Sequence, residues 1–237
     1  MDNLVSYQLD GGIATLTMDD GKANVMSVRM LQAINAALDR AQADQAVVVL
    51  AGRAGMFSGG FDLSVFKSGD ASETCRMLEA GARLSERLLS FPRPVIAACT
   101  GHAIAMGVFV LLSADVRIGV DQGARFQMNE VQIGMTLPRF AIEVSRQRLA
   151  PAHLHLAAVM AEPYTPQQAV VAGFLDEAVP AESLAATVQA RAERLVKLHA
   201  ESFTTTKLRL RQPALAALHD AIRDDMADWT ARFGQPA

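Results

Sequence analysis

The fold is decided by residues 94–114, PVIAACTGHAIAMGVFVLLSA. Val95–Cys99 is small and β-branched enough to form a strand that is buried on both faces. Thr100-Gly101-His102 breaks this strand, and the apolar residues that follow predict a buried helix starting near Met106. The first N–H groups of such a helix have no partner inside it and point back at the turn. With the positive end of the helix dipole they can stabilise an oxyanion, although a strand and helix packed in a core would show the same pattern.

Strands and helices alternate on both sides of this stretch through the first two-thirds of the chain. Helices dominate the last third, so the pattern predicts an α/β core with a helical C-terminal appendage. The expected strands are Leu4–Leu9 and Ile13–Met18 as a hairpin, Val47–Leu50, Asp115–Gly119, Ala124–Gln127 and Leu175–Val179. The expected helices are one capped by Ser27, one over about 71–90, one starting at Thr165-Pro166 and ending at Gly173, one over Glu182–Ala200 and one toward Trp229. Residues 51–62 are expected to be a glycine-rich loop.

Composition excludes several classes of protein. Of the 237 residues 51% are apolar and 20% are charged, so the chain can bury a core, and a net charge of −3 without a long basic run argues against a nucleic-acid binder. The apolar runs within 94–114 are too short to span a membrane. Cys75 and Cys99 have no CxxC partner and no secretory signal is visible, which predicts a cytoplasmic protein. His153 and His155 point to different sides of a helix, so we expect no metal site.

Several motifs follow one another in an informative order. FSGGFDL at Phe57–Leu63 resembles the loop F-x-x-G-A-D-[IL], and PVIAACTGHAIAMG resembles P-[VT]-I-A-A-[VI]-x-G-x-A-x-G-G-G. SADVRIG, ARFQMNEVQIGMTLP and TPQQAVVAGFLDEAVP then match later landmarks in the same order. From about Leu4 to about Lys207, the chain therefore resembles the crotonase, or enoyl-CoA hydratase/isomerase, superfamily.

This resemblance implies an architecture and a ligand. The expected fold is a crotonase-like spiral of ββα units over residues 1–180, followed by a helical region over 181–237 that mediates trimerisation. The implied assembly is a homotrimer or a dimer of trimers. The implied substrate is an acyl-CoA thioester, and no separate cofactor is expected because coenzyme A is part of the substrate.

The resemblance also implies the catalytic residues. The backbone N–H groups of Phe61 and Met106 would form the oxyanion hole for the thioester oxygen, and Met106 stands where the family usually has glycine. Because the donors belong to the main chain, this departure need not abolish the hole. Glu130 would be the acid/base. Around the CoA and acyl parts of the substrate the resemblance implies Lys22, Ala23, Gly60, Asp62, Leu63, Phe109 and Lys207, with Asp62 mainly tying down its loop.

The number of carboxylates favours one reaction over another. Hydratases of the family use two glutamates, and here the first of those positions is Phe109 while the second is Glu130. Moving a double bond from C3–C4 to C2–C3 needs one group that removes a proton at C2 and returns it at C4. Apolar neighbours such as Val131 and Ile133 would desolvate Glu130 and raise its pKa, which suits both steps.

The sequence therefore predicts an enoyl-CoA isomerase of the single-glutamate kind. Enoyl-CoA hydratase is the alternative enzyme. A degenerate member that binds acyl-CoA without turnover is a third reading, favoured by Met106 and Phe109 and opposed by the intact Glu130 and FSGGFDL loop.

Overall fold

The strands form two sheets within residues 4–233, the part of the chain that the computed structural model describes. The larger sheet has six strands in the order β1-β2-β3-β5-β7-β9, and the smaller has three in the order β4-β6-β8. β1 and β2 form an antiparallel hairpin, and the other pairings in both sheets are parallel. The strands are β1 (Val5–Asp10), β2 (Ile13–Met18), β3 (Val47–Ala51), β4 (Gly55–Ser58), β5 (Val95–Cys99), β6 (Gly101–Ile104), β7 (Val116–Val120), β8 (Phe126–Gln127) and β9 (Glu177–Val179).

After the hairpin the chain winds as a spiral of ββα units, as expected. Each turn gives one strand to the large sheet, the next to the small sheet, and then a helix: β3 and β4 precede α3, β5 and β6 precede α4, and β7 and β8 precede α5. The helices are α1 (Val28–Ala43), α2 (Leu63–Ser68), α3 (Ala71–Ser90), α4 (Met106–Ser113), the 3-10 turn η1 (Val131–Ile133), α5 (Arg139–Arg146), α6 (Pro151–Ala158), α7 (Pro166–Ala172), α8 (Ala181–Val196) and α9 (Ala200–Phe233).

The cap signals in the sequence are confirmed. The Ser27 side chain accepts a hydrogen bond of 3.2 Å from the Met30 N–H at the start of α1. At the start of α7, Thr165 and Gln168 form a reciprocal capping box, and Gly173 ends that helix in the left-handed conformation.

The predictions for two glycine-rich segments are wrong in detail. The expected loop over 51–62 contains β4, and the expected break at Thr100-Gly101-His102 is confined to Thr100 because β6 begins at Gly101. A Cβ on Gly101 would lie 1.9 Å from the carbonyl carbon of Gly55, so the two strands approach more closely than side chains allow. Glycine at such a contact is indistinguishable from a turn glycine in the sequence.

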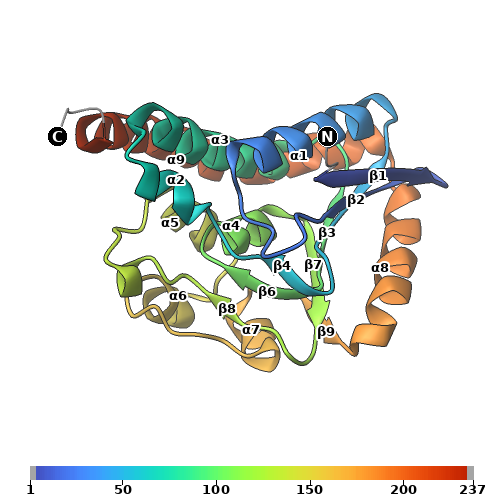
Figure 1. Ribbon diagram of the computed structural model, residues 1–237. Coiled ribbons are helices and arrows are strands. Elements are labelled where there is room, and N and C mark those ends of the chain that lie inside the picture. The colour runs from blue at the N-terminus through green and yellow to red at the C-terminus, as the bar shows by residue number, and fades with distance from the viewer. Residues whose placement is uncertain (1–3, 234–237) are drawn as a thin grey trace.

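The large sheet is covered on both faces. Alternate strand residues such as Val47 and Val49 pack with Leu184 and Val188 of α8, while Val48 and Leu50 face the main core beneath α1, α3 and α4. Figure 1 shows α1, α3 and α9 lying together across one side of the molecule and α8 standing apart from them.

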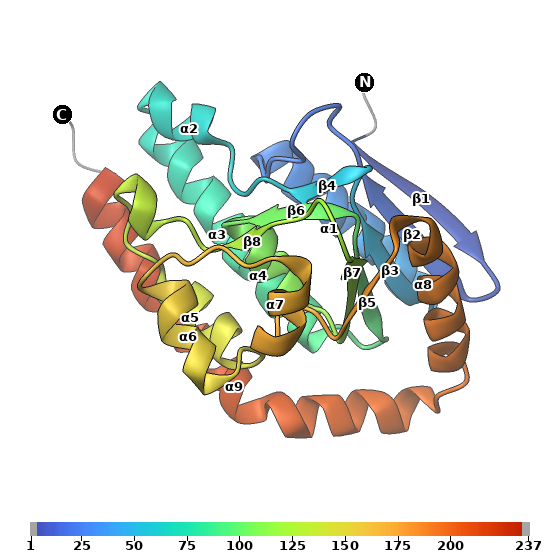
Figure 2. The same ribbon diagram turned by 90° about the horizontal axis from the view of Figure 1, so that it is seen from below.

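The predicted C-terminal region, 181–237, begins with α8 and continues as α9. Both helices pack on the spiral, α8 on the large sheet and α9 on α3 and α5. A boundary between two units at residue 180 therefore stays a prediction. Figure 2 shows α9 changing direction part-way along its length. Pro213 lies inside this helix and removes one backbone hydrogen bond, which accounts for the bend.

Candidate active site

A small cavity of about 50 Å³ lies at the carboxyl end of the three-stranded sheet. Gly59 and Phe61 follow β4, Ala105 follows β6, and Asn129 and Glu130 follow β8. Carboxyl ends of neighbouring parallel strands meet at one sheet edge, which is where open α/β sheets bind ligands. The remaining lining residues are Leu63, Phe66, Ile133 and Met135.

The loop after β4 is fixed by a buried asparagine that sequence reasoning missed. The Asn24 side chain donates hydrogen bonds to the carbonyl oxygens of Met18 and Phe57, at 3.0 and 3.2 Å. The backbone carbonyl of Asn24 accepts a hydrogen bond of 2.7 Å from the Ser58 hydroxyl. The Ser58 hydroxyl in turn accepts 3.2 Å from the Gly60 N–H. Asn24 adopts φ +48°, and Asn in a loop such as DDGKAN is the one signal that could have indicated this role.

Ala23 and Lys22, both predicted to border the nucleotide of coenzyme A, lie on the same loop as Asn24. The Ala23 carbonyl accepts a hydrogen bond of 2.7 Å from Gly59 N–H, which ties this loop to the cavity rim. The Lys22 carbonyl accepts 2.7 Å from Arg53 Nη1, while the Lys22 side chain is exposed to solvent. The structure therefore brings Ala23 next to the cavity and leaves the Lys22 ammonium free at the surface.

Close backbone contact joins the loop after β4 to the start of α4. A Cβ on Gly60 would lie 2.8 Å from Ala105 Cβ and 3.4 Å from the Met106 nitrogen, and a Cβ on Gly107 would lie 2.5 Å from the Ser58 carbonyl oxygen. Ala105 adopts φ +50° and ψ −123°, a strained conformation for a residue with a Cβ. Strain of this kind persists only where surrounding contacts hold it.

The amides of Phe61 and Met106 are brought to this junction, and neither has a hydrogen-bond acceptor among residues 4–233. Met106 is the first residue of α4, whose opening N–H groups have no acceptor inside the helix. The side chains of both residues point elsewhere: the Phe61 ring and the Met106 methyl pack on Gly81 of α3, where a Cβ would lie 2.6 Å from the ring. Backbone donors, not side chains, are therefore what these residues offer a ligand.

Glu130 also lines this cavity and is buried, with only 7% of its surface exposed. Its Oε2 atom is buried without a hydrogen-bond partner in the described part of the chain. Burial among apolar side chains raises the pKa of this carboxyl to about 7, because the cavity solvates the charged form poorly. Its backbone carbonyl accepts from Ile133 N–H and Met135 N–H, at 3.1 and 2.9 Å, which fixes the residue at the start of η1.

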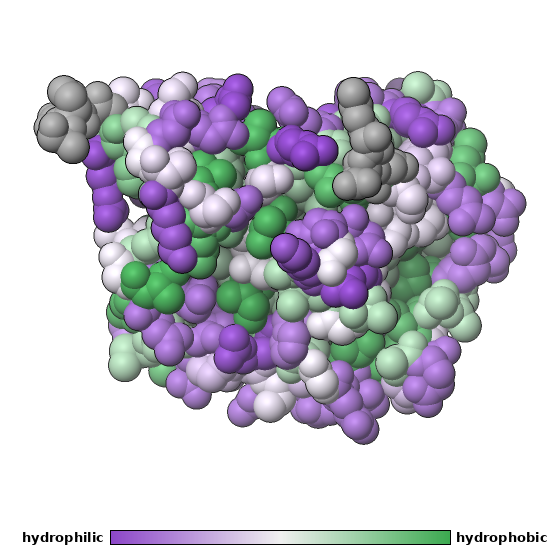
Figure 3. Space-filling view, viewed as in Figure 1, coloured by the Kyte–Doolittle hydropathy of each residue, from purple (hydrophilic) through white to green (hydrophobic). Residues whose placement is uncertain are grey.

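Leu63 and Ile133 lie at the mouth of the cavity. They are 50% and 48% exposed while their side chains also line it. A single water molecule needs about 15 Å³, so the cavity in this form holds water and not an acyl chain. Figure 3 shows apolar patches on the face over η1 and α6, and Val131 and Ile133 of η1 are exposed.

Phe109, Lys207 and Asp62 do not line the cavity, and the side chain of each makes contacts elsewhere. Phe109 is buried in the core, where its ring meets Phe140 edge-to-face at 5.8 Å. Lys207 is also buried, and its ammonium donates to Asp115 Oδ2 at 2.8 Å and to the Phe91 carbonyl at 3.0 Å. Asp62 caps α2, as its side chain accepts from the Ser64 N–H and hydroxyl.

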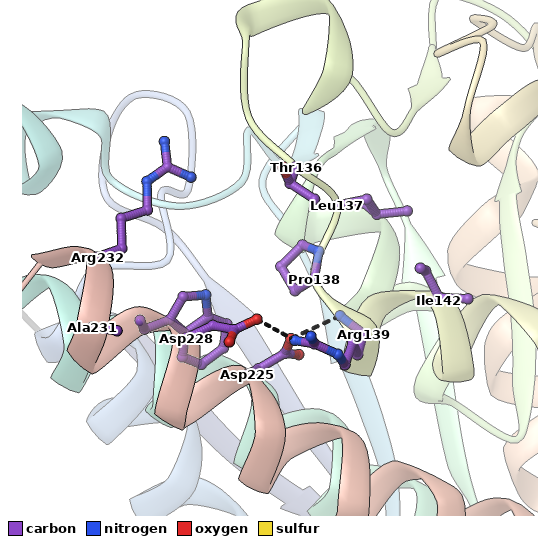
Figure 4. Close-up of a pocket in the computed structure, with 10 residues that line it drawn as sticks. Thr136, Leu137, Pro138, Arg139, Ile142, Asp225, Asp228, Ala231 and Arg232 are labelled. Carbon is purple, nitrogen blue, oxygen red and sulfur yellow. Dashed lines mark hydrogen bonds and ion pairs between the residues drawn. The ribbon is translucent and has the colours of Figure 1, made fainter.

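A larger groove, of about 650 Å³, lies between the start of α5 and the end of α9 (Figure 4). It is lined by Trp229, Leu137 and Pro138, and Arg139 forms ion pairs there with Asp225 and Asp228. The groove contains none of the residues predicted for the active site.

Other site types are not found in residues 4–233. No three of their His, Cys, Asp and Glu side chains are grouped as metal ligands would be. None of the helices described is long and apolar enough to cross a membrane.

A family model described as enoyl-CoA hydratase/isomerase matches residues 8–233. The chain belongs to this family. An enoyl-CoA hydratase/isomerase family protein from Pseudomonas syringae is 44% identical, with a TM-score of 0.93 over 95% of this chain and 97% of that one. An enoyl-CoA isomerase from Mycobacterium tuberculosis is 39% identical, with a TM-score of 0.91 over 96% of this chain and 99% of that one. A probable enoyl-CoA hydratase from Bacillus subtilis is 33% identical over 142 residues, a match that spans 59% of this chain and 54% of that protein.

The enoyl-CoA hydratase/isomerase family acts on acyl-CoA thioesters, so a thioester is the ligand to fit to this cavity. The unbonded amides of Phe61 and Met106 lie at the junction beside this cavity, and the unpaired carboxyl oxygen belongs to Glu130, which lines it. Together, such backbone donors can polarise a carbonyl, and such a carboxyl can move a proton on the carbon beside it.

Proposed function

We propose that the protein shifts the double bond of 3-enoyl-CoA to give trans-2-enoyl-CoA, with Glu130 as the single acid/base. The observation that carries this proposal is the unpaired Oε2 of Glu130, buried in a cavity that Phe61 and Ala105 also line. An unpaired carboxylate oxygen is costly to bury, and a substrate C–H beside a thioester gives it a proton to take.

The reaction begins with the thioester oxygen at the amides of Phe61 and Met106. Glu130 removes a proton from C2, and negative charge moves to the thioester oxygen, where the two N–H groups stabilise it. Losing one such donor costs about 3 kcal/mol of transition-state stabilisation. Glu130 then returns the proton to C4, and the double bond closes between C2 and C3. A pKa of about 7 makes the same group a usable base and a usable acid near neutral pH.

The isomerase is favoured over the hydratase by the count of carboxylates. Glu130 is the one carboxylate among the cavity-lining residues, all of which belong to the described part of the chain. The segment α4 contains no acidic residue, and Phe109 packs on Phe140 instead of facing the cavity. The Mycobacterium tuberculosis relative is named enoyl-CoA isomerase in one solved structure and probable enoyl-CoA hydratase in another, so its names favour neither reaction.

Enoyl-CoA hydratase is the second candidate, since the Bacillus subtilis relative carries that name. The third reading, binding without turnover, is opposed by the intact arrangement of Glu130 and the two free amides.

Substrate-binding residues and assembly belong to the same proposal. Ala23, Gly60 and Leu63 border the thioester, and the exposed Lys22 is a partner for the phosphates of coenzyme A. The buried ammonium of Lys207 is already bonded to Asp115, so we do not assign it to the phosphates. A cytoplasmic homotrimer or dimer of trimers, using no cofactor besides the CoA of its substrate, completes the proposal.

The test is a product assay with 3-enoyl-CoA and with trans-2-enoyl-CoA, using the wild type and Glu130→Gln. The proposal expects efficient conversion of the first substrate, slower hydration of the second, and at least a 1,000-fold loss of isomerisation in the variant. Hydration as the faster reaction would establish the hydratase instead. Thermal protection by CoA without turnover of either substrate would establish a binding protein.

A further inference from the structure

The turn that carries Glu130 has few hydrogen bonds to the rest of the fold. The backbone bonds of residues 129–137 are internal, since the carbonyl oxygens of 129–131 accept from the N–H groups of 133–135. Residues 131–134 are exposed, so packing does little to hold them. In the described part of the chain, one hydrogen bond joins residues 129–137 to a residue outside this segment, and that bond belongs to the side chain of Gln132.

Gln127 is the partner of Gln132 in this bond. The Gln127 Nε2 atom donates 3.0 Å to Gln132 Oε1 and 2.8 Å to the Ala161 carbonyl oxygen, so both amide hydrogens are used. Gln127 ends β8 and is buried, with 5% of its surface exposed. Ala161 adopts φ +51°, a conformation that a residue with a Cβ keeps only where surrounding contacts hold it. The bond therefore ties η1 both to the end of β8 and to the segment after α6.

Gln127 is also bonded to the element that carries an oxyanion donor. Its backbone carbonyl accepts 2.9 Å from the Ala105 N–H, and Ala105 directly precedes Met106, the first residue of α4. Gln127 is also the strand partner of Ile104 in the pairing of β6 with β8. One residue thus holds the start of α4 through its backbone and the turn of Glu130 through its side chain.

The glutamine pair does not face the substrate. Gln127 and Gln132 line a separate pocket of about 400 Å³, and neither lines the cavity of Glu130. The charged residues of that pocket, Arg125 and Glu162, are exposed, whereas Glu130 is the one titratable residue that lines its own cavity. Any effect of the pair on the reaction must therefore pass through the position of Glu130.

We infer that the bond between Gln127 and Gln132 fixes the distance from Glu130 to the oxyanion donors, which makes both glutamines positioning residues. The inference rests on the proposed function for the role of Glu130 as the base. A base must lie within reach of the proton that it removes, and a misplacement of about 1 Å costs roughly 100-fold in rate. Without the bond the exposed turn is free to shift, and the carboxyl gains contact with water.

The test compares two substitutions of Gln132, because this exposed side chain can change without disturbing the core. Gln132→Met keeps the length and removes the acceptor, whereas Gln132→Glu keeps an acceptor for Gln127 Nε2. Isomerisation of 3-enoyl-CoA is measured across pH 5–9, and kcat is compared on the plateau above the midpoint of each protein.

We expect Gln132→Met to lower kcat at least 10-fold and to change KM less than threefold. It should also move the pH midpoint of kcat/KM below that of the wild type, by about 0.5 or more, because a hydrated carboxyl ionises more easily. Gln132→Glu should retain at least a third of kcat, and its added negative charge should move the midpoint the other way.

Two controls isolate the bond. Gln167 is also exposed and donates 2.7 Å to the Asp121 carbonyl oxygen, but it does not line the cavity, so Gln167→Met should leave kcat unchanged. Gln127→Met should lose at least as much kcat as Gln132→Met. The double variant should lose less than threefold more than Gln127→Met, because both substitutions break the same bond. Melting temperatures identify variants that fail to fold, and Gln132→Ala then replaces Gln132→Met.

Four results would overturn the inference. These are a kcat within threefold of the wild type in Gln132→Met, a loss that appears in KM alone, an equal loss in Gln132→Glu, and fully multiplied losses in the double variant.

Failure of the proposed function is seen separately. A wild type that hydrates trans-2-enoyl-CoA but does not isomerise refutes that function, and the same variants are then compared in hydration. If neither substrate reacts, the pKa of Glu130 is followed without substrate, as the difference in thermal unfolding from the matching Glu130→Gln variant across pH 5–8. A midpoint that falls in Gln132→Met supports the positioning role, and an unchanged midpoint overturns it.

Discussion

Asp225 Oδ2 accepts a hydrogen bond of 2.8 Å from the backbone N–H of Phe140, 85 residues earlier in the chain. Its other oxygen accepts 3.0 Å from the Arg139 N–H, so a carboxylate on α9 caps the start of α5. The residue before α5 is Pro138, whose side chain cannot accept a hydrogen bond, so no neighbouring side chain caps this helix. The cap holds Phe140 where its ring meets both Phe109 and Trp229.

Removing this cap should destabilise the protein. We expect Asp225→Ala to lower the free energy of unfolding by about 1–2 kcal/mol, the usual cost of a lost N-cap, and Asp225→Asn to cost less because it keeps one acceptor. Urea titration measures the difference. Asp228→Ala is the control, because that exposed ion pair with Arg139 should contribute less than about 1 kcal/mol. Equal costs for the Asp225 and Asp228 variants would contradict the capping role.

The raised pKa of Glu130 predicts a linked change in rate and stability. Isomerisation needs the ionised base, so kcat/KM should rise with pH through about 7. The folded protein binds this proton more tightly than the unfolded chain, whose glutamate titrates near 4.5. The Glu130 contribution to stability is therefore full below about pH 4.5 and is lost as pH rises through about 7.

Glu130→Gln should accordingly be more stable than the wild type at pH 8, by up to about 3 kcal/mol, while it is inactive. The difference should shrink toward pH 5, where both side chains are neutral. Thermal unfolding across pH 5–8 measures it, and a pH-independent difference would show that Glu130 titrates normally in the fold.

Gly107 sets the position of α4 against the loop after β4. In Gly107→Ala the new Cβ would meet the Ser58 carbonyl oxygen at 2.5 Å, so the Met106 amide must shift away from residues 60 and 61. A displacement of about 1 Å at such a site costs roughly 100-fold in rate, and we expect that loss in kcat. Gly123→Ala, whose new Cβ meets no atom within 4 Å and which does not line the cavity, should lose stability through its φ of +68° but retain kcat.

Asp115 is the counter-charge of two buried cations, Lys207 and Arg211. It accepts 2.8 Å from Lys207 and 3.0 Å from Arg211, and burial already lowers the pKa of Lys207 to about 8. Asp115→Asn should cost about 3–5 kcal/mol at pH 7, because it leaves both cations buried without a counter-charge. The cost should fall above pH 8 as Lys207 loses its proton. Adding Lys207→Met should recover part of the loss, and a pH-independent cost would contradict the electrostatic explanation.

Sequence patterns predicted the long elements but not the small sheet, and the candidate site residues came from the resemblance to the family. Val95–Cys99 and the Ser27 cap are local signals, and the structure confirms both. The strand β6 was missed because Gly101 resembles a turn residue unless the neighbouring Gly55 backbone is known. The burial of Glu130 could be anticipated from its apolar neighbours, whereas the roles of Asn24 and Asp225 depend on partners far away in the chain.

The three short segments that line the cavity leave the carboxyl ends of three successive strands of one small sheet. Each segment belongs to a different turn of the spiral and is anchored by its own strand. Substitution within one segment can therefore alter which atoms meet the substrate without disturbing the layers that hold the other two. Residues after β4, β6 and β8 can change and alter the chemistry of the site, while the packed sheets and helices that stabilise the fold stay the same.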